Sequence, residues 1–359
     1  MTLLYSEVEE ELRAAVRGLL ADRCPPAAVL KRIESGPGHR TLDDSVTPMG
    51  DLDLWKTLAG EIGVAGLLVP EELGGAGASA SEVAVVLEEL GRAVAPVPFF
   101  TSSVLATQAL LPTRDALLGE LAEGQKTAAL AVSFAASPYR PLRGAPVRVE
   151  DGRLSGTVTG VAGADVADVV LVPVDGELYA TEGAAVEVVP SLDLTRPVAT
   201  VTFDRTEARR VGACDLAGVL RSGAALLASE QLGVAEWCLD TTLAYVKDRH
   251  QFARPVGSFQ AIKHRLADLW LDVVRARAAA RNAVADPSPV SVAVAQSWNA
   301  AVAVHAAEEA LQLHGGIGMT WEHPVHLYLK RAKAAEIALG TPGDHREALA
   351  SLAGVPGPE

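Results

Sequence analysis

The segment YVKDRHQFARPVGSFQAIKHRL, from Tyr245 to Leu266, predicts the end of one helix, a tight connection and the start of a second helix. Lys247 and Arg249 fall in the last turn of the first helix, where the helix dipole favours cations. Pro255 interrupts the helical pattern, and Ser258 is positioned to cap the helix that follows. A helix–turn–helix unit of this kind belongs to a largely helical protein, and the rest of the chain supports that expectation.

Arg249 and Phe252 give this connection a possible chemical role. A guanidinium beside an aromatic face suits a phosphate joined to a flat ring system. The same spacing also permits a plainer interpretation, in which the basic residues end a helix and Phe252 lies in the core.

Composition narrows the class of protein. The 359 residues are enough for two or three domains, and 49% hydrophobic with 21% charged residues is typical of globular chains. A net charge of −14 argues against nucleic acid as a partner. The odd number of cysteines, far apart, predicts buried free thiols at Cys24, Cys214 and Cys238. No stretch is long and apolar enough to span a bilayer, and the acidic N-terminus is unlike a signal peptide, so we expect a cytoplasmic protein with no membrane partner.

The first two parts of the chain differ in character. Residues 1–126 read as a helical domain, in which Ser79 and Glu82 form a capping box before an apolar helix. Residues 127–210 read as a small antiparallel β domain. Two hairpin turns are predicted there, at Asp151-Gly152 and Asp175-Gly176, because glycine accepts the positive φ of a type I′ turn.

Residues 211–359 read as long helices with short connections, which pack as an antiparallel bundle. The third of these helices ends in QLHGGIG, from Gln312 to Gly318. One glycine would end a helix, whereas three within four residues suggest a backbone that something approaches closely.

Carboxylates near these motifs are candidates for a general base, and Glu322 is the best placed of them, beside the glycine turn. The others, which we expect to be surface charges or structural ion pairs, are Glu230, Glu236 and Asp240. No metal site is expected, since the nearby histidines lack metal-ligand spacing.

Four segments of the chain resemble acyl-CoA dehydrogenases: RHQF, ARPVGSFQAIKHRLADL, LHGGIGMTWEHPVHLYLKRAK and, near the N-terminus, LLVPEELGGAG. The resemblance implies an α+β, mainly α fold with an N-terminal helical domain, a small middle β domain and a C-terminal four-helix bundle. It also implies FAD as cofactor, an acyl-CoA substrate and an electron-transfer flavoprotein as electron acceptor.

By the same resemblance, one set of residues contacts the adenine–pyrophosphate end of an FAD whose flavin ring lies in the neighbouring subunit. The residues implied are Arg249, Gln251, Phe252, Gln260, Gln312, Gly315 and Gly316.

The chain departs from the family pattern in the half that should hold the ring and the substrate. The usual Thr-Glu-Pro segment reads Val132-Ser133-Phe134, and the tryptophan expected near residues 156–161 is missing. The usual catalytic glutamate is replaced by Leu339, and the less common position for the base falls near Gly223.

Two hypotheses therefore remain open. The chain is a companion subunit, which lends the adenine-end half of a shared FAD site to a second, complete acyl-CoA dehydrogenase subunit. Alternatively, it is a self-sufficient homomeric enzyme with a relocated base, for which Glu322 is the weak candidate.

Overall fold

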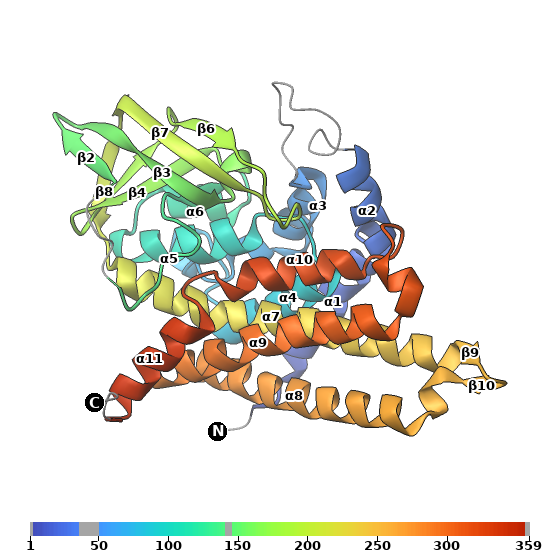
Figure 1. Cartoon of the computed structure of the whole chain (residues 1–359). Coiled ribbons are helices and arrows are strands. Elements are labelled where there is room, and N and C mark those ends of the chain that lie inside the picture. Colours follow the sequence, from blue (N-terminus) through green and yellow to red (C-terminus); the bar gives the residue numbers. More distant parts are fainter. Residues whose placement is uncertain (1–2, 36–49, 141–145, 356–359) are drawn as a thin grey trace.

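The computed structural model describes residues 3–35, 50–140 and 146–355. Figure 1 shows helices at the N-terminal end, a β domain to one side of them and a bundle of long helices that runs across the molecule. The predicted fold is confirmed.

The N-terminal helices pack around α4, which begins at the predicted capping box of Ser79 and Glu82. Two segments of this part are wound as π-helix, η2 (Leu58–Ile62) and η5 (Phe99–Ala106). The α-helices are α1 (Glu7–Arg23), α2 (Pro26–Ser35), α3 (Leu52–Thr57), α4 (Ala80–Ala93), α5 (Thr107–Leu110) and α6 (Leu117–Ala122).

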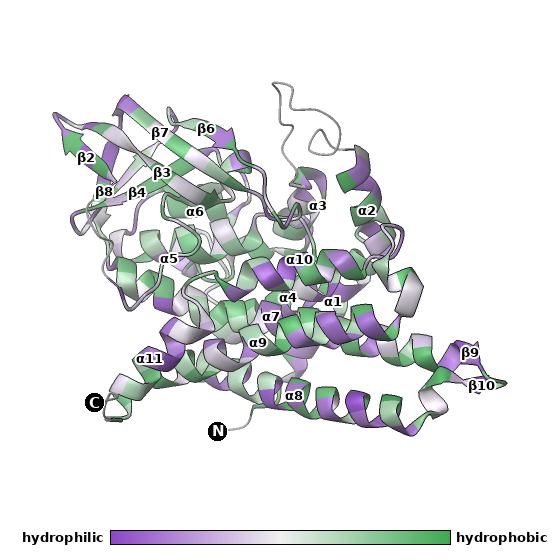
Figure 2. Cartoon of the chain, in the orientation of Figure 1, coloured by the Kyte–Doolittle hydropathy of each residue, from purple (hydrophilic) through white to green (hydrophobic). Residues whose placement is uncertain are grey.

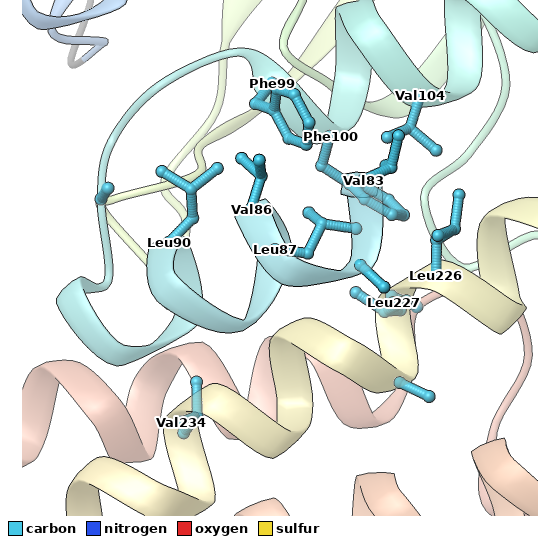
Figure 3. Packing of buried hydrophobic residues seen from close by; sticks show 14 of the residues in the cluster. Val83, Val86, Leu87, Leu90, Phe99, Phe100, Val104, Leu226, Leu227 and Val234 are labelled. Carbon is cyan, nitrogen blue, oxygen red and sulfur yellow. The ribbon is translucent and has the colours of Figure 1, made fainter. Parts of the chain in front are cut away.

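Helix α4 meets the bundle helix α7 (Leu216–Asp248) at unusually close range. A Cβ added to Gly91 would lie 2.2 Å from the carbonyl oxygen of Glu230, and one added to Gly233 would lie 2.0 Å from that of Glu88. The two backbones are therefore in contact at glycine, and the surrounding valine, leucine and phenylalanine side chains form the core seen in Figure 3.

The β domain consists of two four-stranded sheets, ordered β1-β4-β5-β8 and β2-β3-β7-β6, with a hydrophobic cluster built from both. Both predicted hairpin turns are present, with positive φ at Asp151, Gly152, Asp175 and Gly176. The strands are β1 (Ala128–Leu130), β2 (Val147–Glu150), β3 (Arg153–Ala162), β4 (Val169–Val174), β5 (Glu177–Thr181), β6 (Ala185–Val188), β7 (Val198–Glu207) and β8 (Arg209–Ala213).

The expectation of a purely antiparallel domain is wrong at one strand. β1 pairs in parallel with β4, and the chain between them makes the β2–β3 hairpin of the other sheet. β4 is buried on both faces: Val170 and Val172 point between the sheets, whereas Val169 and Leu171 join the core of the helices. This double burial explains why its sequence is a continuous apolar run.

The C-terminal bundle is formed by α7, α8 (Gln260–Ala285), α9 (Pro289–Leu313) and α10 (Val325–Glu336), followed by α11 (Pro342–Leu352). Between α7 and α8 a two-stranded hairpin, β9 (His250–Gln251) and β10 (Arg254–Pro255), projects from one end of the bundle (Figure 1). Figure 2 shows hydrophilic residues recurring along α8 and on β9. Ser258 does not cap α8 as predicted: Phe259 is the N-cap residue and provides no side-chain hydrogen bond, because residues 256–258 form a 3₁₀ turn.

A buried ion network joins the β domain to the bundle. The Arg331 guanidinium of α10 donates to Asp193 and Glu230, and Arg196 also pairs with Glu230. Burial alone would raise the pKa of Glu230, but the two guanidiniums hold it below its ordinary value. Removing one partner of such a network is costly, so it fixes the β domain on the helices.

Cys24, Cys214 and Cys238 are free and buried, as predicted. Within the described ranges, no helix combines the length and the apolar character needed to cross a bilayer.

Candidate functional site

The hairpin after α7 holds the first group of candidate residues. Arg249 is the C-cap residue of α7, and its amide donates to the carbonyl of Tyr245. In the ladder that follows, Gln251 lies opposite Arg254 and His250 opposite Pro255.

The hairpin turn is made without glycine. Phe252 and Ala253 both have positive φ, 54° and 59°, a conformation that costs a side-chain-bearing residue about 1–2 kcal/mol. The Phe252 side chain is 85% exposed, so the interpretation that placed it in the core is wrong. A strained turn that holds an aromatic ring in water is typical of a binding element.

The glycine turn lies at the same end of the bundle. α9 ends at Leu313, and the buried His314 ring stacks on Tyr245 of α7 with centroids 4.5 Å apart. Burial lowers the pKa of His314, which therefore packs as a neutral ring.

The three glycines of this turn have different reasons to be glycine. Gly315 has φ of 63°, and a Cβ on Gly318 would lie 2.6 Å from the carbonyl oxygen of Leu311. Gly316 has neither constraint, and a Cβ there would meet nothing within 4 Å. The exposed backbone of Gly315 and Gly316 is thus open to close approach by a ligand.

The structure places all the predicted adenine-end residues on the surface at this end of the molecule. Gln260 begins α8 directly after the hairpin, and Gln312 lies in the last turn of α9. A guanidinium, side-chain amides and open glycine backbone are a donor set that fits a diphosphate. Sequence reasoning missed Arg254, whose position opposite Gln251 depends on the strand register.

The position of the usual catalytic base lies elsewhere. Leu339 follows α10, is fully buried, and has φ of 54°. The second base position, Gly223 of α7, lies beside it: a Cβ on Gly223 would be 3.1 Å from Leu339 Cδ1 and 2.4 Å from Leu105 Cδ2. Both positions therefore lie side by side in the apolar core, next to Leu105.

The alternative carboxylates do not supply a base there. Glu230 is held in the buried ion network, while Glu236 and Asp240 pair with Arg92. Glu322 is exposed, and its pKa is lowered by hydrogen bonds from its own amide and from the Thr320 hydroxyl. It also precedes α10, whereas Leu339 follows it, and this helix of 12 residues is roughly 18 Å long.

The segment that replaces the Thr-Glu-Pro motif is tied down on both sides. The Phe134 amide donates to the Gly160 carbonyl of β3 at 2.8 Å, and the Leu339 amide donates to the Phe134 carbonyl, also at 2.8 Å. The Phe134 ring packs edge-on against Phe100, and the Arg196 guanidinium lies over both rings. The amide and the carbonyl of Phe134 thus both form hydrogen bonds within the chain.

A second contact closes the same region. His345 of α11 is fully buried and hydrogen-bonds through Nε2 to the Leu339 carbonyl, which leaves Nδ1 facing the Tyr139 hydroxyl at 3.2 Å. Burial lowers the pKa of His345, so the neutral ring donates to one partner and accepts from the other. His345 therefore connects the loop that contains Tyr139 to the turn at Leu339.

A pocket of about 250 Å³ remains between β3, the loop at residues 190–193 and α10. Its floor contains Arg196, Asp193 and Arg331, which already satisfy one another. The volume is below the roughly 300–1,000 Å³ of typical ligand sites. Among the described residues, this pocket by itself is smaller than a site for a flavin ring together with a thioester.

The hairpin and the glycine turn lie at one end of the helical bundle. The Leu339 region lies at the other end, near the β domain (Figure 1). A helical N-terminal part, a small β domain and a helical bundle are the architecture of flavin-dependent dehydrogenases that act on acyl thioesters.

The chain belongs to the acyl-CoA dehydrogenase family, FAD-dependent oxidoreductases that act on the CH–CH bond of acyl-CoA thioesters. Its residues 6–113 match the model of the acyl-CoA dehydrogenase N-terminal domain, and residues 215–352 match that of the C-terminal domain.

Individual relatives agree with this assignment. The chain is 38% identical to acyl-CoA dehydrogenase IpdE2 of Mycolicibacterium smegmatis, over 97% of this chain and 98% of the relative. Among solved structures, it is similar to a chain of the ChsE4-ChsE5 complex from Mycobacterium tuberculosis, with 30% identity and a TM-score of 0.83 over 99% of this chain and all of that one. It is also similar to the Tcur3481-Tcur3483 steroid ACAD G363A variant, with 28% identity and a TM-score of 0.81 over 98% of this chain and 99% of the other.

Proposed function

We propose that this chain is a companion subunit of a heteromeric acyl-CoA dehydrogenase. It contributes the adenine-end half of a shared FAD site, through Arg249, Gln251, Phe252, Gln260, Gln312, Gly315 and Gly316. The partner contributes the ring-binding half, the catalytic base and the acyl-CoA pocket. The chemistry that FAD supplies there is acceptance of a hydride from the substrate β carbon.

The observation that carries the proposal is the burial of Leu339 in the hydrophobic core beside Gly223, where Leu105 also packs. A base must come within hydrogen-bond reach of the substrate α carbon. Here one of the two positions that the family uses for a base is a buried leucine and the other is a buried glycine, so neither supplies a carboxylate.

Geometry supports the sharing of the site between two chains. The hairpin and the glycine turn lie at the far end of the bundle from the β domain, so one chain cannot bring its own two halves together (Figure 1). In a paired assembly, each chain presents its hairpin end to the ring-binding region of the other. When one of the two chains has a closed ring region, one complete site remains for each pair.

The relatives support the same arrangement. Two of the similar solved structures carry paired names, ChsE4-ChsE5 and Tcur3481-Tcur3483, and the second is described as a steroid ACAD. A CoA thioester of a steroid-derived acid is accordingly the substrate class to test first, with an electron-transfer flavoprotein as the electron acceptor.

The test is a flavin count. Expressed alone, the chain should be colourless or weakly yellow and inactive on acyl-CoA thioesters. Co-expressed with an acyl-CoA dehydrogenase chain that has an intact base, it should yield a complex with about one FAD per two chains. Substrate should reduce that FAD in the absence of oxygen.

A matched variant identifies the half-site. Arg249→Ala in this chain should lower flavin retention by the complex about tenfold or more, while the pair still assembles. A yellow homo-oligomer with one FAD per chain and turnover on any acyl-CoA would overturn the proposal and return attention to Glu322.

A further inference from the structure

Unpaired cations gather at the hairpin end of a strongly acidic chain. Lys247, Arg249, Arg254 and Lys263 are exposed and form no ion pair with any residue that the structure describes. Arg265, just beyond Lys263 on α8, is neutralised by Glu309, and Arg277 further along the same helix is neutralised by Glu236. With a net charge of −14, a cluster of free positive charge is not a consequence of composition.

The strand register places one of these cations next to the predicted anion-binding residues. Gln251 and Arg254 are directly opposite each other, so their side chains project from the same face of the ladder. Arg249 precedes Gln251 by two residues, and its carbonyl accepts from the amide of Val256, two residues after Arg254. The period of two along a strand therefore brings Arg249, Gln251 and Arg254 to one face.

Arg254 is also held in place. Its guanidinium carbon lies 3.8 Å from the centroid of the Phe259 ring, and Phe252 meets that ring at 81° with centroids 6.2 Å apart. Stacking leaves the N–H edge of a guanidinium free to donate, and it removes rotamer freedom before any ligand arrives.

The segment beyond Phe259 adds donors without a competing acid. α8 starts there with no side-chain cap, and its first turn contains no acidic residue. The free amides at the start of this helix favour an anion beside Phe259 and Arg254.

We propose that Arg254 is a second guanidinium ligand of the FAD diphosphate, which it clamps together with Arg249. A diphosphate carries two negative charges, which two guanidiniums neutralise and one does not. This inference rests on the proposed function. It assigns to the chain the preference for the dinucleotide over FMN, because FMN has a single phosphate and lacks the AMP half of FAD that this face contacts.

The test compares FAD and FMN binding by the assembled pair, followed as quenching of flavin fluorescence on titration of the flavin-free complex. Arg254→Ala should weaken FAD binding about tenfold or more and leave FMN binding within about twofold. Arg254→Lys should recover only part of the loss, since it keeps the charge but loses the planar fork. Phe259→Leu should fall between the wild type and Arg254→Ala, because the guanidinium loses its platform.

Lys247→Ala is the matched control. It removes one free charge from the same end of the molecule but from α7 rather than from the ladder, so its effect should stay within about twofold. Gel filtration of every pair verifies assembly.

Equal FAD affinity for Arg254→Ala and the wild type, with Arg249→Ala still weakened, would overturn the role of Arg254 and leave the proposed function standing. An equal loss for Lys247→Ala would also overturn it, because nonspecific charge would then account for the effect. A wild-type pair that takes up no FAD would overturn both proposals.

Discussion

Replacing Leu339 by glutamate tests whether the catalytic position of this chain is closed to water. Leu339 is fully buried against Leu105 and the backbone of Gly223. A carboxylate there would lie in the apolar core, so it should remain protonated, with a pKa raised towards the 8–9 recorded for buried glutamates. The matched control is Leu339→Gln, which has nearly the same shape, no charge and the same backbone requirement.

The magnitude follows from linkage. A glutamate ionises at about 4.3 in the unfolded chain, and each unit of pKa shift is worth about 1.36 kcal/mol. Because the folded-state pKa is raised, the variant loses stability as the pH rises above about 4.3. At about pH 7.5 the additional loss relative to Leu339→Gln should be about 4 kcal/mol, and at about pH 5 only about 1 kcal/mol.

Urea unfolding of both variants at the two pH values measures this difference, and comparing the variants cancels titrations elsewhere in the chain. Leu339→Glu should also show no acyl-CoA oxidation in the absence of a partner. Equal stability of the two variants at about pH 7.5, or turnover by Leu339→Glu alone, would refute the closed site.

Three further outcomes are expected. Ala253→Gly should stabilise the free chain by up to about 1 kcal/mol, measured as a rise in Tm, because glycine adopts the positive φ of this turn without strain; an unchanged or lowered Tm would contradict it. Gly233→Ala should destabilise by about 1–3 kcal/mol in urea, since its Cβ would lie 2.0 Å from the Glu88 carbonyl oxygen. Gly18→Ala, on an open face of α1, should instead stabilise by about 0.5–1 kcal/mol, and a similar sign for both would argue against the close crossing. Burial, together with neighbouring His314 and His326, lowers the pKa of His323 to about 4, so stability should fall as the pH drops from about 6.5 towards 4, and His323→Gln should flatten that slope in thermal unfolding.

Local signals in the sequence predicted much of the fold. The Asp-Gly pairs at residues 151 and 175 specify their hairpin turns, because each gives glycine the positive φ that such a turn requires. The Ser79–Glu82 box marks the start of α4 in the same way. The domain limits of 1–126, 127–210 and 211–359 stay a prediction.

Features that depend on tertiary contact were beyond sequence reasoning. The Phe252-Ala253 turn contains no glycine, so nothing in its letters indicated a tight hairpin. The parallel pairing of β1 with β4 joins segments 41 residues apart, and no local pattern encodes it. Arg254 became visible as a candidate ligand only through its register with Gln251.

The candidate site also has one feature that the sequence predicted and one that only the tertiary structure reveals. The resemblance to the family predicted that Leu339 replaces the usual catalytic glutamate. It did not predict how the leucine side chain packs at that position. A leucine at that position is compatible with an open pocket that merely lacks a base. The burial of Leu339 beside Gly223 changes that interpretation, because the leucine side chain is part of the hydrophobic core.

The Leu339 region is buried, whereas the hairpin end of the bundle is exposed and strained. This contrast favours a site shared between two chains. At the Leu339 end, the chain buries apolar side chains and satisfies its backbone groups internally, as a stable core does. At the hairpin end, it holds Phe252 in water on a strained turn, which lowers the stability of the isolated chain. Several cations at this end also have no ion-pair partner among the residues that the structure describes. We propose that such an arrangement becomes favourable when a ligand and a second chain cover the hairpin end. Since the β domain of this chain lies away from that end, the proposed companion role has a partner supply the covering surface.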